Sequence, residues 1–457
     1  MHINRFKNIL ITALVFLALY STSAIWFEDT GGNFLTLFAR TRHQIADIYL
    51  MRSFAFPMRI VTGDGSHDFH ISYSGMSDNV VRAFGDEVLL SALSQSYAPR
   101  TAPPDFGEIL AGRLIIYEYA FELPSDEFSR ALGLPQSPPP IPSFNRIIFF
   151  PAELGLNVYF HNRNTGAWAG YTATDKYFQE GFAALSNSLQ SSSNILRWNS
   201  SFLLGFDPNP HNNLFIPVWY GESYYYPVGE ARIAHFDPAV VGSPKSTIRT
   251  NLMSFFDNPA AVYDASIGRT FAWADENTIV RYFHNNVIQY ISYRRDLRNT
   301  ELLEDFAAAL DFMARRDVFL TNDFFLSGFE ERNNERVFYF DYILEGLPVI
   351  FSDALRNGIS DQTENGITVR FRDGSLVSYT RLAYEFTVNT ALVESANRDL
   401  PLYILNSGLD MESLESITLA FAAPRVDIVG AGIMNLWVDF RMWDGMSSME
   451  SLNTNPD

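Results

Sequence analysis

The sequence of residues 5–29 is RFKNILITALVFLALYSTSAIWFED, and it fixes the topology that we expect for the whole chain. Arg5 and Lys7 precede an uncharged run over residues 8–27, and the first acids follow that run directly. About 20 helical residues span about 30 Å, the thickness of the hydrocarbon core of a bilayer. Because a basic flank stays on the cytoplasmic side, we predict a cytoplasmic tail at 1–7, a transmembrane helix at 8–27 and an extracytoplasmic remainder.

The residues near the outer end of the apolar run leave two topologies open. Thr22, Ser23 and Ala24 are small residues of the kind found at signal-peptide cleavage sites, so a cleaved signal peptide is the alternative to an anchor. The apolar stretch continues past this point, however, and ends in Trp26 and Phe27, which suit an aromatic anchor at the membrane interface. We therefore predict a single-pass protein of the cell membrane with a cytoplasmic N-terminus.

One side of the predicted transmembrane helix carries small side chains. Ala18 and Thr22 are four residues apart and Ser21 lies beside them, so the three share one face. Such a face permits close contact between helices in lipid, although the ordinary composition of an anchor helix would also produce it. We take Ala18, Ser21 and Thr22 as the candidate face for a transmembrane partner.

Composition limits the class of the extracytoplasmic part. The chain has 457 residues, of which 47% are hydrophobic, and this is enough for more than one hydrophobic core. A formal charge of −19 disfavours nucleic acid as a partner, because phosphate contacts need clustered Lys and Arg. The absence of cysteine excludes disulfides, thiolate zinc sites and cysteine nucleophiles. We interpret the acidity as a solvated surface that keeps an exported protein in solution.

Alternating and helical apolar patterns succeed one another along the chain and predict an α+β fold of antiparallel sheets with packed helices. We expect an N-terminal α+β region at 28–240, interrupted by a proline-rich segment at 134–143 that cannot form regular structure. A central domain of one helix and a strand meander follows at 241–299, and a C-terminal α+β domain at 300–457. Both of these domains begin with a helix followed by short strands, as a repeated layout would.

Several local patterns make sharper predictions. Residues 145–171 predict three antiparallel strands, and residues 260–264 predict a strand. Residues 300–316 predict a helix that is capped by Thr300, with acids in its first turns and arginines at its end. Residues 430–435 lack the third glycine of a dinucleotide fingerprint, so we interpret them as a close-packed turn.

No motif in the sequence identifies a catalytic, cofactor or metal site. Neither a Gly-x-Ser-x-Gly motif nor a Walker lysine occurs. His67 and His70 fall on opposite sides of a predicted strand, which favours a polar strand edge over a metal site. The 52 acids leave a pair of glycosidase carboxylates open, but no pair can be singled out. We therefore predict no enzyme activity, no cofactor and no metal.

The aromatic run WYGESYYY at 219–226 allows two interpretations. Rings exposed as a patch would mark a contact site for glycan or for a partner protein. Rings packed between a sheet and a helix would be part of the core, and we favour this second interpretation.

Several segments resemble, in order along the chain, those of one known family. They are the basic and apolar head at 5–20 with Trp26, and the segments LMSFFDNPAAVY (252–263), YFHNNVIQY (282–290), FDYILEGLPV (340–349) and VRFRDGSLVSYTR (369–381). Together they resemble the YycH proteins, which accompany the WalK (YycG) sensor kinase of low-GC Gram-positive bacteria. Residues 98–143 depart from the family pattern.

This resemblance implies a non-enzymatic regulator that binds the sensor histidine kinase, and commonly a YycI-like protein, through both its transmembrane helix and its ectodomain. We identify no small-molecule substrate in the sequence. YycI-like proteins share the anchor but are typically much shorter, so the length of this chain favours YycH. The competing class is an exported cell-wall glycan-binding protein or hydrolase.

Overall fold

The structure, a computed structural model, shows mainly antiparallel sheets with a few packed helices, which confirms the predicted α+β class. Within the described residues, no helix has both the length and the apolar composition needed to cross a bilayer. The predicted tail and transmembrane helix lie outside those residues. The ranges that the structure describes are 50–66, 68–73, 80–94, 99–192, 196–206, 213–219, 224–233, 244–268, 270–295, 299–317, 320–351, 365–395, 414–423, 432–442 and 447–451.

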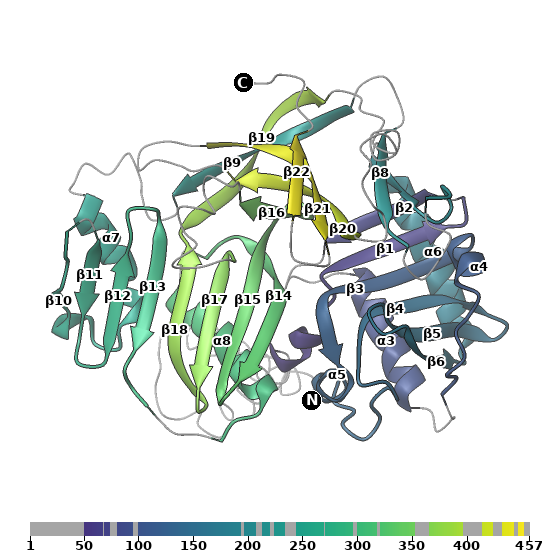
Figure 1. The fold of residues 1–457 in the computed structure, drawn as a ribbon, viewed down its shortest axis with the longest axis horizontal. Helices are drawn as coiled ribbons and strands as arrows, with labels where there is room; N and C mark the ends of the chain where they lie inside the picture. Colours follow the sequence, from purple (N-terminus) through teal and green to yellow (C-terminus); the bar gives the residue numbers. More distant parts are fainter. Residues whose placement is uncertain are drawn as a thin grey trace, which may run out of the picture. The chain divides into compact units, whose positions relative to one another are not determined.

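The first sheet has eight strands in the order β6-β5-β4-β3-β1-β2-β7-β8, and all of its pairings are antiparallel (Figure 1). The meander predicted at 145–171 is confirmed, because β4, β5 and β6 pair in sequence. The strands are β1 Arg59–Asp64, β2 Asp68–Tyr73, β3 Arg113–Pro124, β4 Ser143–Ala152, β5 Gly155–Asn162, β6 Ala167–Ala173, β7 Leu196–Ser200 and β8 Phe215–Trp219.

Helices pack against this sheet through apolar faces. α3 and α6 contact β1, β5 and β6. Gly85 lets α3 come close to the sheet, because a Cβ there would lie 1.9 Å from the hydroxyl oxygen of Tyr117. That hydroxyl donates to the carbonyl of Val81 at 2.9 Å. The helices of this part are η1 Ser53–Ala55, α3 Val80–Ser94, α4 Phe106–Leu110, α5 Ser125–Ala131 and α6 Lys176–Ser192.

The second sheet has 14 strands, and β10–β13 continue into β18, β17 and β15 through the antiparallel pairing of β13 with β18 (Figure 1). One of its pairings, between β16 and β20, is parallel. The strands are β9 Tyr224–Ile233, β10 Tyr263–Asp264, β11 Phe271–Ala274, β12 Thr278–Tyr282, β13 Val287–Ser292, β14 Asp323–Arg332, β15 Glu335–Leu344, β16 Leu347–Phe351, β17 Ile367–Arg372, β18 Ser375–Leu382, β19 Tyr384–Ser395, β20 Leu414–Ala423, β21 Gly432–Met442 and β22 Ser447–Ser451.

Two helices precede the two strand groups of this sheet, as the repeated layout predicts. α8 buries an apolar face, and the ring of its Phe306 lies 5.5 Å from Phe338 and 6.2 Å from Phe340 of β15. The helices are α7 Pro244–Leu252, η3 Met253–Phe255, η4 Pro259–Ala261 and α8 Leu302–Arg316.

Three local predictions were wrong. Residues 260–264 form a strand only at their last two residues, because Pro259 begins a short 3-10 helix that Asn258 caps through the amide of Ala260. The N-cap of α8 is Glu301, and Glu304 accepts a hydrogen bond from its amide at 3.0 Å. The hydroxyl of Thr300 donates instead to Asp305 at 2.7 Å.

The third wrong prediction is the close-packed turn at 430–435, since residues 432–435 belong to the long strand β21. Their pairing with β9 and β20 supplies the hydrogen bonds that a turn would otherwise provide.

The domain boundaries predicted from sequence do not coincide with the boundaries of the two sheets. β9 lies inside the predicted region 28–240 and pairs with β19 and β21 of the second sheet. The pairing of β13 with β18 crosses the boundary predicted at 299/300. That 28–240, 241–299 and 300–457 are separate domains stays a prediction.

Candidate functional site

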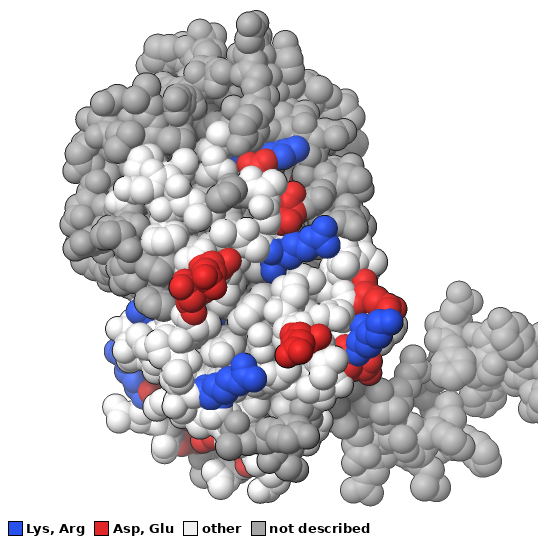
Figure 2. Space-filling model, turned by 90° about the vertical axis from the view of Figure 1, so that its right-hand side faces the viewer, with Lys and Arg blue, Asp and Glu red and all other residues white. Residues whose placement is uncertain are grey.

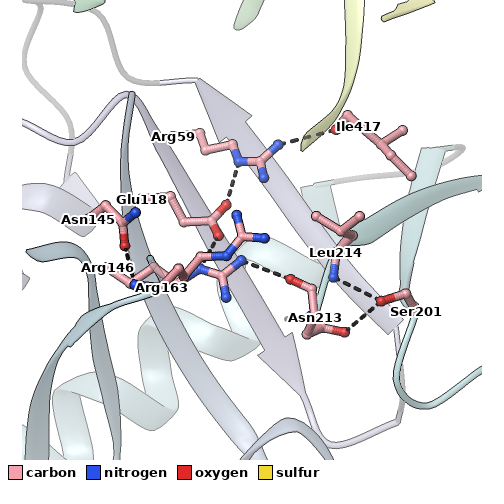
Figure 3. Close-up of polar contacts among 9 residues, drawn as sticks. All are labelled: Arg59, Glu118, Asn145, Arg146, Arg163, Ser201, Asn213, Leu214 and Ile417. Atoms are coloured by element: carbon pink, nitrogen blue, oxygen red, sulfur yellow. Dashed lines mark hydrogen bonds and ion pairs between the residues drawn. The ribbon is translucent and has the colours of Figure 1, made fainter. Parts of the chain in front are cut away.

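A buried network of charges occupies the middle of the first sheet (Figure 3). Glu118 on β3 lies opposite Arg59 on β1 and Arg146 on β4 in the strand register. Arg59 Nε donates to one oxygen of its carboxylate, and Arg146 Nε donates to the other at 2.7 Å. The three side chains are at most 5% exposed. Burial opposes the ionisation of Glu118, but the two guanidinium groups outweigh it and lower its pKa to about 2.

The network reaches beyond the three side chains to two other segments of the chain. Arg59 Nη1 donates to the carbonyl of Ile417 on β20 at 3.3 Å, and Arg146 Nη2 donates to the carbonyl of Asn213 at 2.8 Å (Figure 3). Ser201 Oγ accepts from the amide of Leu214 at 2.9 Å and holds that segment in place. Because the charges are buried and fully engaged, this arrangement suits a clamp between segments better than a ligand site.

A second buried ion pair fixes the end of α8. Asp317 and Arg381 of β18 are both buried, and Arg381 Nη2 donates to Asp317 Oδ1 at 3.0 Å. The hydroxyl of Tyr379 donates to the other carboxylate oxygen at 2.8 Å. Burial and the charge of Asp317 raise the pKa of Tyr379 well above its ordinary value, so the phenol stays a donor. The pair joins the helix to the sheet.

A polar hollow of about 360 Å³ lies next to the start of α8. Arg336 binds two carboxylates there: Nη1 donates to Asp305 Oδ2 and Nε to Glu331 Oε1, both at 2.8 Å. The same guanidinium donates to the carbonyl of Thr300 at 2.8 Å. A glycosidase needs one carboxylic acid and one carboxylate acting on a sugar. Two acids held by one cation suit a structural ion cluster better than such a pair.

A second hollow, of about 310 Å³, opens at one end of the β10–β13 meander. We call it the meander-end pocket. Its floor is aromatic, and it is made of Phe255, Tyr290 and Phe312. The rings of Tyr290 and Phe312 lie 4.9 Å apart. Its rim is charged, and it consists of Asp257, Asp275, Glu276, Arg294 and Arg316 with uncharged polar neighbours.

Exposed tyrosines flank the meander-end pocket. Tyr293 follows the lining residue Ser292, and Tyr263 lies on the edge strand β10, two residues after the lining residue Ala261. Both tyrosines are 60% exposed. The strand register places both at the same end of the meander as the pocket, since Tyr263 is opposite Ala274 and Thr278 is opposite Ser292. An aromatic and arginine-containing surface of this kind is typical of protein contact sites.

Charges on the surface are mixed. Figure 2 shows one face of the molecule, on which Lys and Arg side chains lie beside Asp and Glu side chains, with no large patch of one sign among the described residues. Such a surface suits solvation. Across the described ranges, no group of three or more His, Cys, Asp or Glu side chains could hold a metal ion.

Most of the site residues predicted from sequence belong to the first 27 residues of the chain. The candidate partner face (Ala18, Ser21 and Thr22) and the interface anchor (Trp26 and Phe27) lie outside the described residues. In the aromatic run 219–226, Trp219 ends β8 and Tyr224 begins β9. The side chains of the run are outside the described part of the chain, so whether its rings are packed or exposed stays a prediction. His70 lies on β2, partly buried, and burial lowers its pKa.

Comparison with protein-family models and with curated protein sequences finds no match. The crystal structure of YycH from Bacillus subtilis is similar to this chain: the TM-score is 0.54 at 12% sequence identity, over 89% of this chain and 97% of that one. The C-terminal domain of YpeB from Bacillus megaterium matches 45% of this chain at 13% identity, but a TM-score of 0.21 supports no argument. The resemblance to YycH is therefore confirmed at the level of the fold.

Proposed function

We propose that this chain is a membrane-anchored, extracytoplasmic and non-enzymatic regulator of a sensor histidine kinase of the WalK (YycG) type, and that it acts with a YycI-like protein. The observation that carries the proposal is the likeness of fold to YycH over 89% of the chain. The apolar run at 8–27 and its basic flank would supply the membrane anchor.

The regulator would work by binding alone. A bound ectodomain shifts the kinase between signalling states only by the difference between its affinities for the two states. The clamp around Glu118 and the Asp317–Arg381 pair hold the segments that they join, so that little binding energy would be spent on ordering those segments. In the membrane, the face of Ala18, Ser21 and Thr22 would contact a transmembrane helix of the kinase, with Trp26 and Phe27 at the interface.

Co-purification from membranes tests this proposal. The full-length chain, extracted in mild detergent, should recover a sensor histidine kinase and a YycI-like protein. A form that lacks residues 1–27 and is exported by a cleavable signal should recover less of both. Recovery of neither protein by the full-length chain, together with a mature chain that starts after Ala24, would refute the regulator and favour a secreted wall protein.

The transmembrane face has its own test with a matched control. Ala18→Leu with Thr22→Leu places bulk on the proposed face, and Ala13→Leu with Ser23→Leu makes the same kind of change on the opposite side of the helix. We expect only the first pair to reduce the recovery of the kinase. Equal recovery by the two variants would rule this face out as the contact.

A further inference from the structure

We propose that the meander-end pocket binds a lysine or arginine side chain of a partner protein. The inference deepens the proposed function and rests on it for the identity of the partner, whereas the choice of a cationic side chain comes from the pocket itself. Three features carry it: two carboxylates that form no ion pair among the described residues, an aromatic floor, and two exposed tyrosines that flank the pocket.

The charges of the rim are unevenly matched. Arg316 pairs with Asp257 and donates to two carbonyl groups of the η3 segment, so its charge is used within the fold. Arg294 also faces Asp257, with Nη1 3.7 Å from Oδ2. Asp275 and Glu276, in the turn between β11 and β12, form no ion pair with any residue that the structure describes. The pocket therefore presents two carboxylates for which a partner could supply the cation.

One of these carboxylates is held in a fixed position. Asp275 Oδ1 accepts hydrogen bonds from the amides of Asn277 at 2.9 Å and Thr278 at 2.8 Å. A carboxylate that is oriented before binding loses little entropy when it pairs with a cation. The formal charge of −19 further attracts a basic partner and accelerates its approach.

The aromatic residues of the pocket floor are a second group that a bound cation could contact. Phe255 stacks on Tyr379 at 5.9 Å, and Tyr379 is bound to the buried Asp317, so the floor is anchored to the core of the sheet. A cation above aromatic rings gains from their negative faces, and the gain grows when water is excluded. The same combination of groups occurs nearby, because Lys245 of α7 pairs with Asp264 of β10 and lies 5.6 Å from the ring centre of Phe271 of β11.

The flanking surface favours a protein over a free amine. Tyr263 and Tyr293 would remain largely exposed beside a small cation, whereas a polypeptide that extends over the rim would cover both rings. Tyrosine contributes large and rigid contact area to interfaces. The pocket is then the anchor for one basic side chain within a wider contact.

The chemistry of the pocket can be tested without any partner protein. The chain has no cysteine, so Ala261→Cys at the rim accepts a single trifluoromethyl label in the full-length protein. The probes are acetyl-Gly-Lys-Gly-amide and the same peptide with norleucine in place of lysine. We expect the lysine peptide alone to shift the fluorine resonance saturably. Asp275→Asn with Glu276→Asn should abolish the shift, and Glu87→Gln with Glu153→Gln should retain it.

Equal shifts with the two peptides, or no shift with either, would overturn the proposal. A second experiment connects the pocket to the partner. Asp275→Lys with Glu276→Lys should lower co-purification of the kinase or the YycI-like protein by about tenfold. Glu87→Lys with Glu153→Lys makes the same change in net charge at exposed positions elsewhere and should not lower it.

The two experiments separate the two proposals. If the unaltered chain recovers neither protein while the lysine peptide still binds, the regulator fails and the pocket stands. If the unaltered chain recovers its partners and both charge-reversed variants recover them equally, the regulator stands and the pocket is refuted as their contact.

Discussion

Replacing Glu118 by glutamine should destabilise the first sheet strongly while changing almost no volume. The substitution leaves Arg59 and Arg146 buried beside a neutral amide. A fall of the carboxyl pKa from 4.5 to about 2 corresponds to about 3 kcal/mol of favourable interaction in the folded state. Breaking a buried ion pair by removing one partner costs about 3–5 kcal/mol in other proteins. The two estimates agree, and we expect Glu118→Gln to lower the free energy of unfolding by that amount.

Urea unfolding followed by tryptophan fluorescence measures this loss, because Trp168 and Trp198 are buried in the same sheet. Glu153→Gln is the control, since Glu153 is exposed in the β4–β5 turn and should change the free energy by less than about 0.5 kcal/mol. A loss below about 1 kcal/mol for Glu118→Gln would refute the assignment of the network as a clamp.

The same network predicts a dependence of stability on pH. The folded pKa of Glu118 lies below its ordinary value of 4.5, so its contribution is complete above pH 4.5 and is lost as the pH falls toward 2. The unaltered chain should therefore lose more stability than Glu118→Gln over that interval. Parallel pH profiles for the two proteins would contradict the reasoning.

Three further predictions concern single positions. Gly155→Ala should lower the free energy of unfolding, measured by thermal unfolding, by at least about 2 kcal/mol. The reason is that the φ of Gly155 is +109° and a Cβ would lie 1.9 Å from the carbonyl oxygen of Ala173. A loss under about 0.5 kcal/mol would contradict this. Tyr379→Phe should lower the free energy of unfolding in urea by about 1–3 kcal/mol, because it removes a buried hydrogen-bond donor to Asp317. An unchanged urea midpoint would show that another donor replaces the tyrosine hydroxyl. Glu304→Ala should lower the free energy of unfolding by about 1 kcal/mol and accelerate amide hydrogen exchange at the start of α8. The reason is that it removes the side chain that accepts a hydrogen bond from the amide of Glu301. Unchanged exchange would argue against the cap.

Local patterns predicted the strands and helices that have strong periodicity. The helix predicted at 300–316 is α8, which buries one apolar face along its length. The strands predicted at 145–171 are β4, β5 and β6. Two of the three errors fall at boundaries, where one proline or one capping pair decides the outcome, whereas residues 432–435, predicted as a turn, belong to the long strand β21. Pro259 shortened a predicted strand, and Glu301 displaced Thr300 as the cap.

The arrangement of the sheets could not be predicted in this way. β9 pairs with strands more than 150 residues further along the chain, and β16 runs parallel to β20. Such pairings are decided by which apolar surfaces fit together after the elements have formed, and no local pattern encodes them. The last strands, β20–β22, were not predicted for the same reason.

The candidate sites were hidden from sequence for a related reason. Glu118 is one of 52 acids, and its partners lie 59 and 28 positions away along the chain. The meander-end pocket combines residues from η3, the β11–β12 turn, β13 and α8. These segments are far apart in the sequence, and neither the acids of the turn nor the aromatic residues near them indicate a pocket by themselves.

The buried charges lie where separate segments of the chain meet, and this position explains why a cysteine-free protein would retain them. The clamp joins β1, β3 and β4 to β20, and the second pair joins α8 to β18. Apolar residues of similar volume often replace such groups without loss of stability, so stability alone does not account for them. A misaligned pairing, however, would leave a buried charge unpaired. We therefore expect Arg59→Met, Glu118→Leu and Arg146→Met together to restore most of the stability that Glu118→Gln loses, while hydrogen exchange at β20 increases because its alignment on the first sheet is no longer enforced.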